Sequence, residues 1–162
     1  MNKNPKNLSL ADVKKKNTKK FKTKKVVLFE DGTKVDVDLV FKPSMRTQVC
    51  SEFFDLFQYA ITHGKRFDAE IGIGLSTMLI IKHFTSIQTT STSYEELIDM
   101  MVALKDGNYT ETMISAFDEQ ELNIMFQELQ TVINTTVTEI SKIYNEDNHT
   151  KGKKNLNENT KS

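Results

Sequence analysis

Apolar and polar side chains alternate on both sides of the Asp31-Gly32 pair, within the stretch KKVVLFEDGTKVDVDLVF. An Asp-Gly pair between two β-branched runs is typical of a tight β-hairpin turn. After the turn, the apolar residues share one face of the predicted strand: Val35, Val37, Leu39 and Phe41. Because two strands alone are only marginally stable, we expect this face to pack on helices.

Helical spacing of apolar residues follows the hairpin and predicts four to five helices. Pro43 ends the second strand, and Ser44 is a favourable N-cap for a helix that ends at Gly64. The next helix is expected from about Asp68 to Phe84. Three pairs of capping residues then mark three further helix starts: Ser93 with Glu96, Asn108 with Glu111, and Asp118 with Glu121. The sequence therefore predicts an α+β fold in which an N-terminal β-hairpin packs on a helical bundle.

Both ends of the chain are poor in large apolar residues. Such segments cannot repay the entropy lost on ordering, so we expect a disordered arm over residues 1–23 and a disordered polar tail over 146–162. A single domain is then expected over residues 24–145. Cys50 is the only cysteine, which excludes a disulfide framework and favours a reducing compartment. No apolar run reaches the roughly 18–20 residues that span a bilayer.

Charge is unevenly distributed, although the whole chain is formally neutral. Residues 1–25 hold ten lysines and one aspartate, a net charge of +9, whereas residues 26–145 have a net charge of −10. A basic arm of this kind can bind an anionic partner, including nucleic acid. It contains no arginine and only one aromatic residue, Phe21, so sequence-specific readout of bases is not supported.

The stretch LIIKHFTS, residues 79–86, contains the strongest candidate for chemistry, His83. Neither of the other histidines, His63 and His149, lies at a metal-ligand spacing from it. With the apolar neighbours facing the core, we expect Lys82 to point to solvent and His83 to lie at the boundary. A structural role is therefore favoured over catalysis or metal binding.

The remaining candidates also favour structure over chemistry. The IGIG stretch, residues 71–74, lacks the strand and third glycine of a phosphate loop, so close backbone packing or a later helix start is expected at Gly72 and Gly74. Cys50 has no histidine near it and is expected to be a buried small hydrophobe. The acid pairs Glu95-Glu96 and Glu119/Glu121 fall in first helical turns, where they stabilise the helix dipole. We predict no catalytic, cofactor-binding or metal-binding residues.

Aromatic and methionine residues are abundant in the predicted helices. The aromatic cluster covers more than one face of its helix and comprises Phe53, Phe54, Phe57 and Tyr59. The seven methionines include Met100, Met101 and Met125. Core packing is the default for both groups, and adaptable protein–protein contact is the alternative.

The order of these elements resembles the tail assembly chaperones of long-tailed (siphovirus-like) phages of Gram-positive bacteria. The resemblance covers residues 25–145, and its most specific stretches are VLFEDGTKVDVDLVFKPS and LIIKHFTS. It implies a non-enzymatic protein of the host cytoplasm, absent from the mature virion, that binds the tape measure protein and assists tail tube polymerisation. Self-association is a further expectation, and the client-binding residues stay open at this point.

Two alternatives to the chaperone remain. One is another phage morphogenesis protein, of the head–tail connector type, because a hairpin followed by helices is a common plan for small proteins. The other is a small nucleic-acid-binding regulator that uses the lysine-rich arm.

Overall fold

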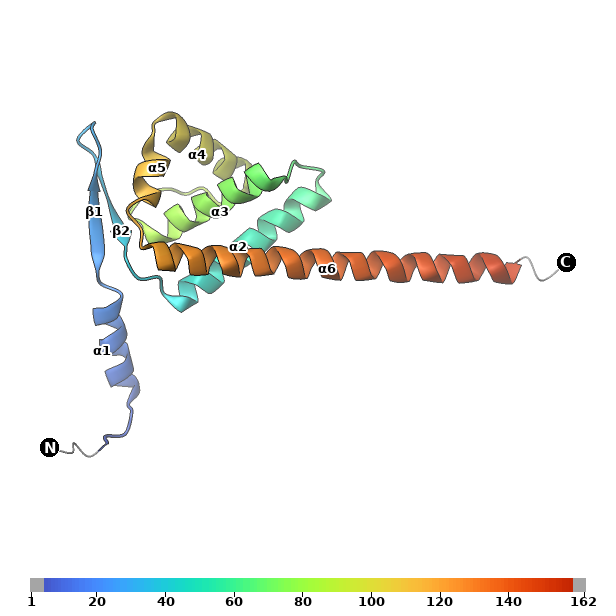
Figure 1. The fold of residues 1–162 in the computed structure, drawn as a ribbon, viewed down its shortest axis with the longest axis horizontal. Coiled ribbons are helices and arrows are strands. Elements are labelled where there is room, and N and C mark those ends of the chain that lie inside the picture. The colour runs from blue at the N-terminus through green and yellow to red at the C-terminus, as the bar shows by residue number, and fades with distance from the viewer. Residues whose placement is uncertain (1–4, 159–162) are drawn as a thin grey trace.

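A computed structural model describes residues 5–158 of the chain, and the side chains of residues 5–146. A helix precedes the β-hairpin and five helices follow it (Figure 1). The elements are α1 (Leu10–Lys20), β1 (Lys24–Leu28), β2 (Lys34–Asp38), α2 (Pro43–Thr62), α3 (Ala69–Phe84), α4 (Tyr94–Asp106), α5 (Tyr109–Ile114) and α6 (Glu119–Glu158). This confirms the α+β class and the hairpin packed on helices.

The hairpin is antiparallel, with Val27 opposite Val35 and Lys25 opposite Val37. Its turn uses Gly32 at φ 83°, a conformation that favours glycine. Asp31 accepts hydrogen bonds from the backbone N–H of Thr33 at 2.8 Å and from the Thr33 hydroxyl at 2.6 Å. The aspartate therefore orders the turn it occupies.

The second strand is held to the segment that follows α3. Val37 forms an isolated antiparallel bridge with Thr85, and the Ser86 N–H donates to the Asp36 carbonyl at 2.8 Å. The Ser86 hydroxyl in turn accepts from the Asp36 N–H at 2.8 Å. The end of LIIKHFTS thus pairs with β2 like a very short third strand. The sequence did not predict this pairing.

The core lies between the hairpin, α2, α3, α4, α5 and the first turns of α6. The inward face of β2 is buried as predicted, because Val35, Val37 and Phe41 are each at most 4% exposed. Leu39, expected on the same face, is only partly buried because β2 ends at Asp38. The largest fully buried side chains are Phe41, Phe53, Phe84, Leu75, Met78, Leu79, Ile80, Ile81, Leu97, Met113, Met125 and Leu129.

Three of the four predicted cap positions are confirmed, and the one at Ser44 is wrong. Ser93 forms a full capping box with Glu96, and Asp118 accepts from the Glu121 N–H at 3.1 Å. The helix expected to start at the Ser44 cap begins instead at Pro43, whose ring fixes φ and needs no N–H partner at the first helical position. Asn108 is the N-cap of α5 as predicted, but its backbone is left-handed and its side chain makes no cap hydrogen bond.

Both terminal segments differ from the expectation of disorder, because helices occupy much of each. Ser9 caps α1 by accepting a hydrogen bond from the Asp12 N–H at 3.1 Å. Lys19 and Lys20 in the last turn interact favourably with the negative end of the helix dipole. No residue of α1 is buried. At the other end, α6 continues to Glu158, because extending a formed helix costs far less than starting one. The domain limits at 24 and 145 stay a prediction.

Candidate functional site

An apolar groove lies where α6 crosses α2 and α3. It has a volume of about 450 Å³, and most of its lining is apolar: Phe57, Phe67, Ile73, Phe126, Leu129, Ile133 and Val137. Phe57 packs edge-on to Phe67 with ring centroids 4.9 Å apart, which fixes the floor of the groove. Ile73 is 63% exposed at its rim. Such a groove suits the apolar face of a helix.

A stripe of apolar residues on α6 leads out of this groove along the helix. It comprises Ile133, Val137, Ile140 and Tyr144, at spacings of four, three and four residues, so all four lie on one side of the helix. We call this the α6 stripe. Val137, Ile140 and Tyr144 are 48%, 41% and 72% exposed. Figure 1 shows α6 continuing well beyond the other helices, so the outer part of the stripe lies away from the rest of the described chain.

The residues beside the α6 stripe are uncharged. Asn134, Thr136 and Ser141 lie next to it on the helix, and Thr136 and Ser141 donate their hydroxyls to backbone carbonyls four residues earlier. A helix docked on the stripe would therefore be selected through apolar contact and shape, with little dependence on its charge.

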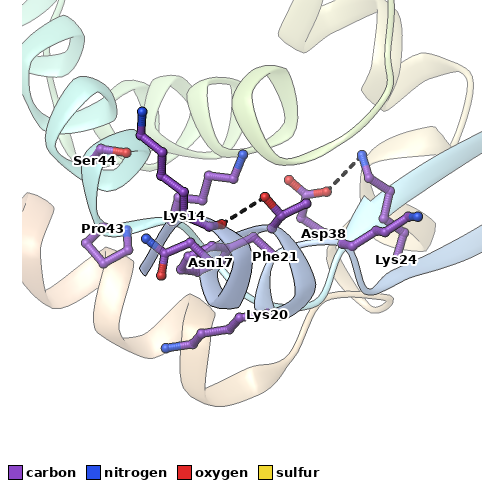
Figure 2. A pocket seen from close by; sticks show the side chains of 11 residues that line it. Lys14, Asn17, Lys20, Phe21, Lys24, Asp38, Pro43 and Ser44 are labelled. Carbon is purple, nitrogen blue, oxygen red and sulfur yellow. Dashed lines mark hydrogen bonds and ion pairs between the residues drawn. The ribbon is translucent and has the colours of Figure 1, made fainter. Parts of the chain in front are cut away.

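A second hollow of about 1030 Å³ lies between α1, the base of the hairpin and the start of α2 (Figure 2). Its lining includes five lysines: Lys14, Lys20, Lys22, Lys24 and Lys42. We call it the basic cleft. Asp38 forms an ion pair with Lys24 at 3.1 Å. Among the described residues, no carboxylate pairs with the other four lysines, and Figure 2 shows the Lys20 amine well apart from Asp38.

Lys82 and His83 are brought to one carboxylate on α2. Glu52 Oε2 lies 3.1 Å from Lys82 Nζ, and Glu52 Oε1 lies 3.0 Å from His83 Nε2. Burial raises the pKa of the Glu52 carboxyl, but the hydrogen bonds from His83 and Lys82 outweigh it and hold that pKa below its ordinary value of 4.5. The cluster holds α3 to α2.

The expectation that Lys82 points to solvent is therefore wrong. Its side chain is only 15% exposed, because Glu52 on the neighbouring helix draws it inward. His83 is 10% exposed, and its ring nitrogen faces the same carboxylate. Glu52 lies 30 positions before Lys82 and 31 before His83, so no local sequence pattern could have revealed it.

Cys50 is half-buried, where full burial was expected. Burial raises the pKa of its thiol and the nearby Glu128 raises it further, which is the opposite of what an activated nucleophile needs.

The glycines of IGIG lie inside α3, so the expected later helix start is wrong. Gly72 faces the Phe67 ring and Gly74 faces the Met101 side chain, so side chains rather than another backbone make the close approach.

Of the paired acids, Glu96 serves its own helix start, whereas Glu95 and Glu121 contact other segments of the chain. Glu96 accepts the N–H groups of Thr92 and Ser93 at 2.9 and 3.0 Å. Glu95 pairs with Lys65 at 2.9 Å. Glu121 accepts the Phe41 N–H at 3.1 Å and ties α6 to the end of the hairpin.

The aromatic cluster and the methionines contribute mainly to the core. Phe53, Phe57, Met100 and Met125 are buried, whereas Phe54, Tyr59 and Met101 are partly exposed.

Over the described residues, no group of three or more metal-ligating side chains comes together. In the same part of the chain, no helix combines the length and the apolar character needed to cross a bilayer.

Comparison with known proteins gives one family. The sequence model of the YomO family matches residues 10–161, nearly the whole chain, so the chain belongs to that family. The family takes its name from YomO of Bacillus phage SPBc2, which is consistent with a phage protein. Neither a curated protein nor a solved structure matches the chain.

Proposed function

We propose that this member of the YomO family is a phage tail assembly chaperone that binds the tape measure protein and assists polymerisation of the tail tube. The observation that carries the proposal is the apolar groove between α2, α3 and α6, continued outward by the α6 stripe. Together they offer one elongated apolar surface. A tape measure protein is long and helical, so its apolar helix faces need covering before the tube encloses them.

The dimensions of the surface suit a helical client. From Ile133 to Tyr144 the α6 stripe spans about 16 Å at 1.5 Å per residue. That length covers three turns of a client helix, with the groove beside Ile73 and Phe126 adding to it. Each copy would bury a modest area, and many copies along one client would gain through avidity.

The proposed role needs no catalysis. The groove is lined mostly by apolar side chains, and the cluster at Glu52 is occupied by its own hydrogen bonds. We propose that the protein acts in the cytoplasm of the host and leaves before the virion is complete. Mass spectrometry of purified particles separates this role from that of a head–tail connector, which would remain in the particle.

The direct test is co-expression with the tape measure protein encoded in the same phage genome. Wild type should move that protein into the soluble fraction, and Val137→Asp/Ile140→Asp should not. The matched control is Thr131→Asp/Thr138→Asp, which places the same charges on the opposite side of α6. A tape measure protein that stays insoluble with wild type, or stays soluble with Val137→Asp/Ile140→Asp, would contradict the proposal.

The basic cleft favours a second candidate, a nucleic-acid-binding regulator. Four of its lysines have no carboxylate partner among the described residues, so they are free to meet phosphates. Against it, residues 26–145, the body beside the cleft, have a net charge of −10, which repels a polyanion. Fluorescence anisotropy with a labelled oligonucleotide at low salt tests this candidate.

A further inference from the structure

We propose that α1 of one copy docks on the outer face of α4 of a second copy, so that copies of this chain join head to tail. The inference goes beyond the proposed function and does not rest on it. It starts from a helix that has no buried residue and therefore gains little from packing on its own chain. Isolated helices of this length are marginal in water, so a partner surface is needed to stabilise it.

The chemistry of α1 defines the partner. Five of its eleven residues are lysines, and Leu8 and Leu10 at its start are 74% and 70% exposed. A partner must therefore combine carboxylates with some apolar surface. A phosphate backbone supplies the charge but offers nothing to the leucines, so a protein surface is favoured over nucleic acid.

The outer face of α4 has this combination. Asp99, Val102 and Asp106 follow one another at spacings of three and four residues, so they share one side of the helix. All three are exposed, Val102 by 49%. Neither aspartate forms an ion pair or hydrogen bond within the described residues.

Asp106 is the last residue of α4, where the helix dipole disfavours a carboxylate. Its position is therefore not explained by the stability of the helix that carries it. The negative end of the dipole and the carboxylate together attract a cation, and the lysines of α1 supply one. Leu10 can then pack against Val102.

The two surfaces cannot meet within one copy in this arrangement. Figure 1 shows α1 continuing from the base of the hairpin away from the body. α4 leads into α5 near the opposite end, where the Tyr109 hydroxyl donates to Asp31 in the hairpin turn. Each copy thus offers one basic and one acidic surface at separate ends, which is the geometry of a heterologous contact. The charges of +9 on the first 25 residues and −10 on the body neutralise each other across it.

The test uses charge reversal and sedimentation of the full chain. At about 10 mM salt, where the Debye length is about 30 Å, the wild-type mass should rise with concentration above that of the monomer. Lys15→Glu/Lys19→Glu and Asp99→Lys/Asp106→Lys should each stay monomeric, with association weakened by about tenfold or more. The control is Asp55→Lys/Glu139→Lys, which changes the net charge equally on exposed positions of α2 and α6 and should associate like wild type.

Mixing the two reversed variants provides the decisive result. In the mixture, the acidic arm of the first variant can contact the basic α4 face of the second variant. The basic arm of the second variant can contact the acidic α4 face of the first. Both contacts join opposite charges, so association should return. A wild-type chain that stays monomeric at low salt overturns the proposal. Failure of the mixture to associate also overturns it. If the wild type instead binds a labelled oligonucleotide and stays monomeric, the arm is a nucleic-acid surface and the contact with α4 is excluded.

Discussion

The rings of Phe41 and Phe84 stack almost parallel, with centroids 3.7 Å apart and an interplanar angle of 4°. Phe41 follows the hairpin and Phe84 ends α3, and both side chains are 1% exposed. Together with the Thr85 and Ser86 contacts to β2, this stack joins the hairpin to the helices. The two stretches that carry the phage resemblance are therefore in direct contact.

Loss of this stack should destabilise the whole fold. Phe84→Ala leaves a cavity among buried side chains, and we expect it to lower the free energy of unfolding by about 3–5 kcal/mol. Urea denaturation followed by circular dichroism measures the change. Phe54→Ala, at a partly exposed aromatic position of α2, is the matched control and should cost clearly less.

A charge on the inward face of β2 should have a comparable effect. Val37 is fully buried and is bridged to Thr85, so Val37→Asp places an unpaired carboxylate where no cation can reach it. We expect a loss of several kcal/mol, on the order of 3 kcal/mol or more. Val26→Asp, at a 54% exposed position of β1, serves as control in the same thermal melts. Equal melting temperatures for the two variants would show that the hairpin does not pack as described.

The Glu52 cluster predicts a pH dependence. The pKa of Glu52 is lower in the folded chain than its ordinary value of 4.5, so the unfolded chain takes up a proton first as the pH falls. Its contribution to stability is present above that ordinary value and is lost as the pH falls through the lowered pKa. Glu52→Gln should therefore be less stable than wild type at neutral pH, and the difference should shrink as the pH falls below 4.5.

His83→Gln separates structure from chemistry at the same cluster. A glutamine can still donate a hydrogen bond to Glu52, so we expect a modest loss of about 1 kcal/mol and unchanged solubilisation of the tape measure protein. Loss of solubilisation at unchanged stability would contradict the structural role of His83.

Removal of residues 1–20 should leave the folded body intact. Because α1 buries no residue, we expect the free energy of unfolding to change by less than about 0.5 kcal/mol. Denaturant melts of the shortened and full chains at about 1 M salt, where charge effects are screened, give the comparison. A larger loss would mean that the arm packs on its own body.

Local signals in the sequence predicted the elements well. Asp31-Gly32, the Ser93–Glu96 capping box and the Asp118 cap each act over a few residues, so their effect can be read directly. The start of α2 was missed because Pro43 and Ser44 both favour a helix start and the proline takes the first position.

The candidate surfaces could be predicted only in part. The apolar residues of α6 were visible as a helical stripe, but which of them stay exposed depends on where α2 and α3 end. The pairing of Lys82 and His83 with Glu52 depends on two helices meeting, which no local pattern encodes. The helix α1 was missed because its composition is polar and its cap at Ser9 is a single hydrogen-bonded turn.

Because the end of α6 protrudes, the melting temperature of the protein can report whether a client is bound to the α6 stripe. Amide protons near Met125 are held by a packed helix, whereas those near Tyr144 are protected by helix hydrogen bonds alone, so protection from exchange should decline along α6. A client that covers this end binds only the folded chain, and mass action then raises the melting temperature as its concentration increases. Binding of a client could therefore be measured by the shift in melting temperature, with no label on either protein.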